Sequence, residues 1–208
     1  FLVGVLFIIS GFIKANDPLG FSYKLDEYFQ VFHMPWLSTV SLWLAIAICA
    51  FEIGLGIALL LGSKMIFTAW SLLLMIVFFT FLTFYSWYFD VVKDCGCFGD
   101  ALHLTPFQSF MKDIVLFILI FFIFVKRKEI KPIVGESPST FLAYTGFIAS
   151  FLFSLYCYWH LPVKDFRPYA IGKSIPAGMQ LPPNAITDSV VMLFLYEKDG
   201  KQLELTMD

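Results

Sequence analysis

Residues 65–89 read MIFTAWSLLLMIVFFTFLTFYSWYF, and none of them is charged. An apolar helix of about 20 residues is long enough to cross the hydrocarbon core of a bilayer. Three more runs meet or approach that length: Leu37 to Leu61, Phe107 to Val125 and Phe141 to Leu161. A shorter apolar run, Phe1 to Ile13, is interpreted as the end of a span that begins before residue 1. The sequence therefore predicts an all-α integral membrane protein with five spans.

The composition of the whole chain agrees with this class. Hydrophobic residues make up 59% of the chain and charged residues 14%, and the mean hydropathy is +0.80. Soluble domains usually carry about 25% charged residues. The net charge of −2 and the pI of about 5.9 argue against a nucleic-acid-binding protein. The lipid bilayer is the first partner that the sequence predicts.

The ends of several helices carry recognisable signals. Asp17-Pro18 should end the first helix, because the residue before proline is disfavoured in the helical region. Thr105-Pro106-Phe107-Gln108 predicts a capping box at the start of a later span. Between the first two spans, five large side chains fall on one face of a short helix: Phe21, Leu25, Tyr28, Phe29 and Phe32. That helix is expected either to lie in the headgroup layer or to pack over the mouth of the bundle.

The distribution of basic residues predicts the orientation. Lys126, Arg127, Lys128 and Lys131 crowd together after the fourth span, so the loop 126–139 is expected to be cytoplasmic. Loop 90–106 and the tail 162–208 then lie outside the cytoplasm, and the fifth span covers 140–161.

The tail has a different character from the spans. Ser189 to Glu197 predicts a strand, Asp199-Gly200 a tight turn, and Gln202 to Thr206 a returning strand. A lone two-stranded hairpin is only marginally stable in water. We therefore expect a small β-containing domain that continues beyond residue 208.

The segment with the strongest chemical signal is residues 94–100, Asp-Cys-Gly-Cys-Phe-Gly-Asp. Cys95 and Cys97 can close a disulfide in an oxidising compartment, and Gly96 permits the tight backbone that such a small ring needs. A strained and exposed bridge tends to be a readily reduced one. Lys112, early in the following helix, could stabilise a thiolate, whereas the two aspartates of the segment oppose this effect.

Three motifs resemble those of the DoxX-like membrane proteins, and of the MauE family in particular. They are Cys95-Gly96-Cys97-Phe98-Gly99, Ser10-Gly11-Phe12-Ile13-Lys14 with Asp17-Pro18, and Phe51-Glu52-Ile53-Gly54-Leu55-Gly56. Together they cover roughly residues 1–125. The additional span and tail are similar to those of longer DoxX-like proteins of Bacteroidetes.

The resemblance implies a four-helix bundle like that of vitamin K epoxide reductase over residues 1–125. It also implies thiol–disulfide chemistry, because MauE proteins are associated with maturation of a disulfide-rich periplasmic subunit. Relatives linked to quinone-coupled sulfur oxidation imply a quinone as a candidate electron acceptor. The chain departs from many redox proteins in having no Cys-x-x-Cys sequence.

A few other residues are candidates for a functional role, each with a structural alternative. Glu52 lies near the middle of its span, where it could relay protons, bind a quinone or only join two helices. Lys14 and Asp17 could form a charged rim, although snorkelling and helix termination are the simpler interpretation. Cys157 is the better candidate for a resolving thiol than Cys49, and buried cysteines are usually apolar fillers. No metal site is expected, since Cys95, Cys97 and His103 are too sparse a set.

Two functions remain open from the sequence. The first is a thiol–disulfide redox protein that uses Cys95 and Cys97, with envelope protein thiols as its substrates. A quinone or a membrane or periplasmic partner protein would then reoxidise the pair. The second is a non-catalytic membrane subunit or anchor, in which the Cys95–Cys97 bridge is a structural disulfide that only constrains its loop. A transporter has little support, because the sequence carries no sign of an inverted repeat.

Overall fold

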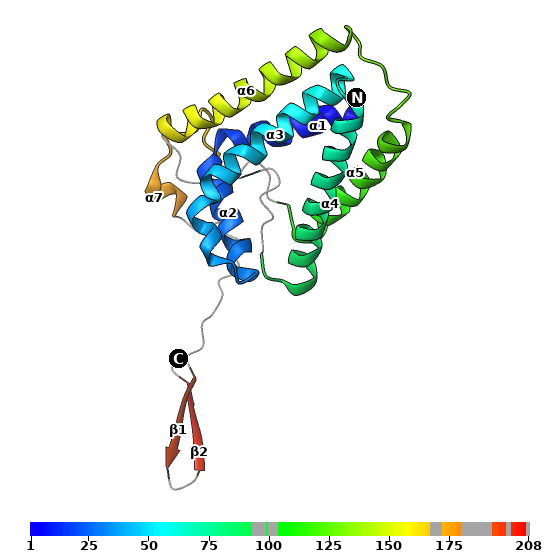
Figure 1. Cartoon of the computed structure of the whole chain (residues 1–208). Coiled ribbons are helices and arrows are strands. Elements are labelled where there is room, and N and C mark those ends of the chain that lie inside the picture. Colours follow the sequence, from blue (N-terminus) through cyan, green and yellow to red (C-terminus); the bar gives the residue numbers. More distant parts are fainter. Residues whose placement is uncertain (93–98, 100–103, 167–171, 180–192, 199–200, 207–208) are drawn as a thin grey trace. The chain divides into compact units, whose positions relative to one another are not determined.

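The computed structural model describes residues 1–92, 99, 104–166, 172–179, 193–198 and 201–206 (Figure 1). The chain divides into two compact units, Phe1–Arg167 and Pro168–Asp208. Cys95, Gly96 and Cys97 lie outside the described residues.

The secondary structure described for the first unit is entirely helical, with loops between the helices. Its elements are α1 (Leu2–Asn16), α2 (Pro18–Val31), a short 3-10 helix η1 (Pro35–Val40), α3 (Ser41–Leu61), α4 (Met65–Phe89), α5 (Pro106–Lys126) and α6 (Glu136–His160). Within the part of the chain that the structure describes, four segments are long and apolar enough to span a membrane: η1 with α3, then α4, α5 and α6. The pair α1 and α2, bent by 96°, adds a fifth if it counts as one span. The prediction of a multi-pass helical membrane protein is confirmed.

Two helix boundaries follow the predicted signals. α1 ends at Asn16, and the Asp17 side chain accepts a hydrogen bond of 3.0 Å from the backbone N–H of Gly20, which caps α2. At the start of α5, Thr105 and Gln108 form the capping box in both directions. Each cap satisfies backbone donors that the first helical turn would otherwise leave unpaired.

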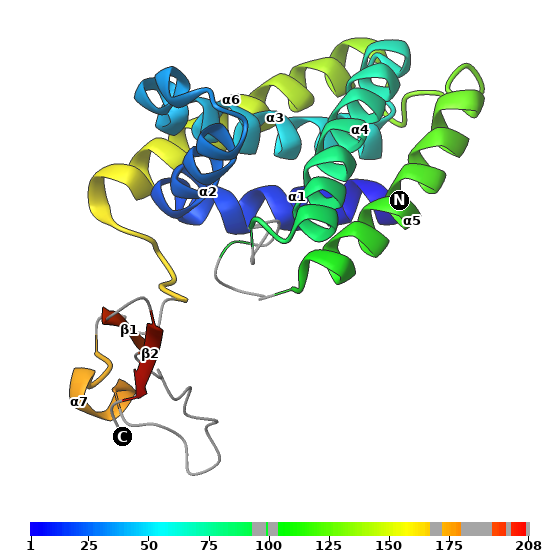
Figure 2. The same cartoon turned by 90° about the horizontal axis from the view of Figure 1, so that it is seen from below.

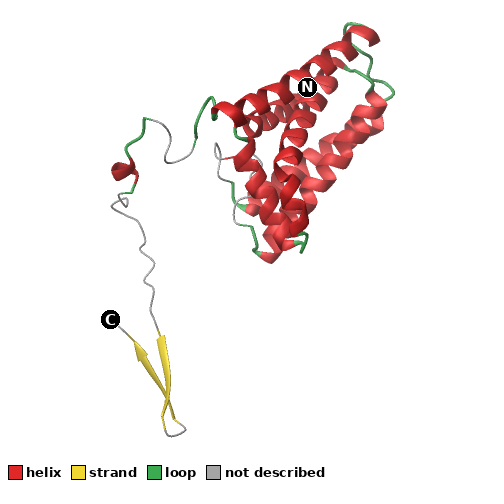
Figure 3. Ribbon diagram, turned by 60° about the vertical axis from the view of Figure 1, so that its left-hand side comes forward, coloured by secondary structure: helices red, strands yellow, loops and turns green. Residues whose placement is uncertain are grey.

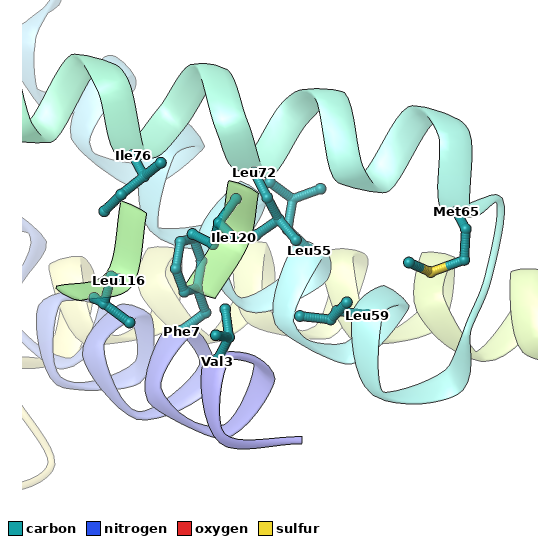
Figure 4. Packing of buried hydrophobic residues seen from close by; sticks show 9 residues of the cluster. All are labelled: Val3, Phe7, Leu55, Leu59, Met65, Leu72, Ile76, Leu116 and Ile120. Carbon is teal, nitrogen blue, oxygen red and sulfur yellow. The ribbon is translucent and has the colours of Figure 1, made fainter. Parts of the chain in front are cut away.

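The helices of the first unit pack in two groups. α1 and α6 pack along α3, whereas α4 and α5 pack against each other as an antiparallel pair (Figures 1 and 2). α1 and α3 approach closely at Gly4 and Gly56, where each glycine faces the backbone carbonyl of the other. A cluster of buried side chains from α1, α3, α4 and α5 joins the two groups (Figure 4); it consists of Val3, Phe7, Leu55, Leu59, Met65, Leu72, Ile76, Leu116 and Ile120.

The apolar face of α2 is buried against the bundle. Phe21, Leu25 and Phe29 form a cluster with Cys49 and Ile53 of α3. Burial of large side chains against a neighbouring helix is the main source of stability for a short helix. Of the two placements open from the sequence, this contact favours packing on the bundle over a free position among lipid headgroups.

The second unit contains α7 (Ile175–Gly178) and two strands, β1 (Leu193–Lys198) and β2 (Lys201–Thr206) (Figure 3). The strands pair antiparallel, and Lys198 lies opposite Lys201. That register leaves two residues for the turn, the length of the commonest hairpin connection. The predicted position of this unit outside the cytoplasm stays a prediction.

Candidate functional site

Two opposite charges from different helices meet inside the bundle. Lys14, near the end of α1, forms an ion pair with Glu52, in the middle of α3. The exposed fractions of their side chains are only 2% and 5%. A charge at this depth is expensive unless it is paired, so the pairing explains how α3 can carry an acid within its span.

The Lys14 ammonium also contacts two aromatic rings. It lies 5.2 Å from the ring centroid of Phe21 on α2 and 4.9 Å from that of Phe79 on α4. A cation over the face of an aromatic ring is attracted by the electron density of that face. One ammonium group therefore joins α1, α2, α3 and α4.

These contacts correct the expectation that Lys14 snorkels, whereas the expected role of Asp17 in ending a helix agrees with the structure. Lys14 does not snorkel toward solvent, because Glu52 and the two rings hold it inside the protein. Asp17 has the structural role of a helix terminus, as its side chain caps α2. The two residues therefore do not form a common charged rim.

A second buried carboxylate lies on α5. Asp113 is 1% exposed; its Oδ1 lies 3.0 Å from the Lys112 ammonium and its Oδ2 accepts a hydrogen bond of 3.0 Å from the Thr83 hydroxyl of α4. Sequence reasoning did not select Asp113 as a site residue. The available signal was its position within an otherwise apolar span, where a charged residue usually faces the bundle interior.

Both ion pairs border the same cavity. It has a volume of about 250 Å³ and lies between α1, α3, α4 and α5. Its lining consists of Leu6, Phe7, Ser10, Lys14, Glu52, Ile76, Phe79, Lys112, Asp113 and Leu116. Of the residues selected from the sequence, the cavity brings together Lys14, Glu52 and Lys112, and it adds Asp113.

The cavity lies toward the end of the bundle that carries the loop between α4 and α5. Lys112 and Asp113 belong to the second turn of α5, and Lys14 lies in the last turn of α1. Gly99, the described residue of that loop, lies beside α1: a β-carbon at Gly99 would have the Ile13 side chain as its nearest neighbour, at 3.7 Å. Lys14, Lys112 and Asp113 thus lie one to two turns from this end of their helices, whereas Glu52 lies in the middle of α3.

The segment after α6 is attached to the same end of α1. The Asn16 side chain donates to the carbonyl oxygen of Lys164 (2.7 Å) and accepts from its backbone N–H (3.2 Å). A side-chain amide that pairs with both groups of one backbone residue fixes that residue's position. Gly99, Asp17 and Phe166 line one shallow depression there.

The two described cysteines are buried and carry free thiols. Cys49 is part of the contact between α2 and α3, and Cys157 lies in the last turn of α6 with 2% of its surface exposed. Neither borders the ionic cavity. Burial denies Cys157 the access that a resolving thiol needs, so its proposed role requires a local opening of the structure.

Comparisons with known proteins give one family and one relative. The model of the family "Methylamine utilisation protein MauE" matches residues 1–126. Protein TlpB of Flavobacterium psychrophilum is 28% identical over 133 residues, which are 61% of this chain and 36% of that protein. The chain thus spans about a third of the length of that relative. No solved structure matches the chain. The family match covers more than half of the chain, from α1 through α5, and the chain therefore belongs to the MauE family.

Proposed function

We propose that this protein is a thiol–disulfide redox protein of the bacterial inner membrane, with Cys95 and Cys97 as its reactive pair on the periplasmic side. The observation that carries the proposal is the buried ionic cavity, which is lined by residues near the start of α5, the helix that follows the cysteine segment in the sequence. A purely structural helical bundle has no need for a buried Lys14–Glu52 pair and a second buried carboxylate at Asp113, since burying such charges costs free energy. Membership of the MauE family supports the same chemistry.

The exchange reaction balances in two steps. A substrate thiolate attacks one sulfur of the Cys95–Cys97 disulfide, which forms a mixed disulfide and releases the other cysteine as a thiolate. A second substrate thiolate then attacks the substrate sulfur of the mixed disulfide. The substrate gains a disulfide and loses two electrons and two protons, while Cys95 and Cys97 become reduced.

Reoxidation of the cysteine pair needs a two-electron acceptor, and the cavity has the chemical character to hold a quinone ring. Its volume is just below the range of about 300–1,000 Å³ that is common for small-molecule sites. Phe7, Ile76 and Phe79 supply apolar walls, and the Lys14 and Lys112 ammonium groups are hydrogen-bond donors suited to carbonyl oxygens. A bound quinone would supply the oxidising equivalent. The two electrons and two protons of the thiols would pass to that acceptor, and the carboxylates of Glu52 and Asp113 are the acidic groups that line the cavity.

The proposal is tested by replacing the reactive pair in cells. We expect a Cys95→Ser/Cys97→Ser variant to leave substrate thiols of the envelope reduced, as measured by alkylation and mass spectrometry. A Cys49→Ser/Cys157→Ser variant is the matched control, because it removes two thiols that are buried. Unchanged envelope disulfides in the first variant would contradict the redox function.

Two further measurements, copurification and the trapping of mixed disulfides, separate the redox function from that of a membrane anchor. An anchor would copurify with a partner in constant ratio, and its activity would be indifferent to Cys95 and Cys97. A redox protein instead accumulates mixed disulfides when a single cysteine of the pair is replaced.

A further inference from the structure

A second cavity lies on the opposite end of the bundle, where α3 turns into α4. This groove has a volume of about 260 Å³ and lies between α3, α4 and α6. Two aromatic side chains at its rim, Phe67 and Tyr144, are 62% and 58% exposed. Because α3, α4 and α6 are long enough to span a membrane, a groove open between them borders lipid.

The groove is polar at one end and apolar at the other. Ser63, Lys64, Thr68 and Thr140 line the end at the turn, whereas Phe51, Gly54, Leu55 and Phe147 line the other end. Phe51 lies ten residues before Leu61, the last residue of α3, which corresponds to about 15 Å along the helix axis. Such a groove suits an elongated molecule with a polar head and an apolar tail.

The polar end carries a positive charge that no acidic side chain neutralises. Lys64 is exposed and lies 5.5 Å from the ring centroid of Tyr144, and within the described ranges no carboxylate pairs with it. The hydroxyls of Ser63 and Thr140 are hydrogen-bonded to each other at 3.1 Å, so they form a small polar patch beside it.

More positive charge lies at the same end of the bundle. The backbone N–H of Ile133 donates to the carbonyl oxygen of Leu61 at 3.1 Å, which attaches the loop after α5 to the turn after α3. That loop follows directly on the basic cluster Lys126, Arg127, Lys128 and Lys131. Clusters of lysine and arginine at the end of a membrane helix attract acidic lipids.

We propose that the groove binds one acidic phospholipid, with its phosphate at Lys64 and an acyl chain along Phe51, Gly54 and Phe147. The ammonium group and the polar patch match the headgroup, and the apolar end matches the chain. The depth of Lys64 in the membrane also suits a lipid headgroup, because the turn between α3 and α4 ends two spans and so reaches the headgroup layer. This inference does not depend on the redox function.

Native mass spectrometry of the full chain tests the proposal, with dioleoyl phosphatidylglycerol and dioleoyl phosphatidylcholine as probes. We expect the wild-type protein to retain the acidic lipid in preference to the zwitterionic one. Lys64→Gln should weaken retention of phosphatidylglycerol about five-fold, the effect of one lysine near an acidic headgroup. Glutamine and lysine are equally strained at the positive φ of 38° found at residue 64, so this variant preserves the turn.

Lys128→Gln is the matched control, since it removes the same charge from the same end of the bundle but lies outside the groove. It should weaken retention of phosphatidylglycerol less than Lys64→Gln does, because Lys128 attracts acidic lipid only as one member of the basic cluster. Ala143→Phe, which fills the groove from α6, should lower the retention of both lipids.

Three results of the lipid-retention experiments would overturn the proposal. They are equal retention of the two lipids by the wild type, an equal effect of Lys64→Gln and Lys128→Gln, and normal phosphatidylglycerol retention by Ala143→Phe. A dimer that Ala143→Phe dissociates would also overturn it, because a second copy of the chain would then be the occupant of the groove.

Discussion

Lys14 on α1 and Glu52 on α3 form an ion pair that is almost completely enclosed by the bundle. The two residues come from separate helices, so the pair fixes how α1 and α3 face each other. It also borders the cavity that we connect with redox chemistry. The stability of the bundle and the chemistry of its interior therefore depend on the same two groups.

Removal of one charge of this pair should destabilise the protein strongly. In Lys14→Met the Glu52 carboxylate loses its counter-charge, and the expected loss of stability is about 3–5 kcal/mol. The double variant Lys14→Met/Glu52→Leu should recover much of that loss, because no unpaired charge remains. Thermal unfolding in detergent micelles measures both. Lys24→Met, which breaks the surface pair of Lys24 with Glu27, is the control and should change stability by about 0.5 kcal/mol or less. A double variant as unstable as the single one would show that the pair is not energetically coupled.

The hydrogen bond between Thr83 and Asp113 should also be measurable. Thr83→Val removes the donor to a buried carboxylate oxygen, and the expected cost is about 1–3 kcal/mol. Thr80→Val is a matched control on the same helix, because the Thr80 hydroxyl donates only to the carbonyl oxygen of Ile76 in its own helix. Equal effects of the two substitutions on the unfolding midpoint would contradict a specific role for Thr83.

The close approach of α1 and α3 predicts a difference between two glycines. A β-carbon at Gly56 would lie 2.8 Å from the carbonyl oxygen of Gly4, which is backbone and cannot move aside easily. Gly56→Ala should therefore cost about 1–3 kcal/mol. At Gly54 the nearest neighbour would be the Phe147 side chain at 3.2 Å, so Gly54→Ala should cost less. Both substitutions bring the same gain in helix propensity, so the difference between their unfolding temperatures measures the cost of separating α1 from α3. Equal unfolding temperatures would contradict the close approach of α1 and α3 at Gly56.

The orientation predicted from the basic cluster can be tested by cysteine labelling of intact cells. After reduction, Cys95 and Cys97 should react with a membrane-impermeant maleimide. A Lys128→Cys substitution on the Cys95→Ser/Cys97→Ser background should react only after permeabilisation. Cys49 and Cys157 are buried and should remain unlabelled in both experiments. The reverse pattern would place the cysteine loop in the cytoplasm.

The spans could be predicted from the sequence because hydrophobicity acts locally along the chain. Met65 to Phe89 is an uncharged run in the sequence and is also the extent of α4. The boundary signals at Asp17-Pro18 and Thr105 were equally local, since the proline acts on its neighbour and the capping box of Thr105 involves a residue only three positions away.

The site could be predicted only in part, because its geometry depends on which helix faces meet. The cost of a charge within a span indicated that Glu52 faces inward, and its ion pair agrees with that expectation. Lys14, by contrast, lies near a helix end, where snorkelling is the usual outcome; only the fold brings Glu52, Phe21 and Phe79 around it. Asp113 was not selected for a similar reason, since its partner Thr83 lies on another helix.

The central claim is that Cys95 and Cys97 form a disulfide that is reversibly reduced and reoxidised. Titration of the purified protein against glutathione buffers, with alkylation and mass spectrometry of the peptide that contains both cysteines, measures this directly. We predict a two-electron transition in which both thiols appear together, at a potential above the roughly −300 mV that marks inert structural disulfides. Two thiols that stay reduced at every potential, or a bridge that resists reduction throughout the range, would contradict the claim.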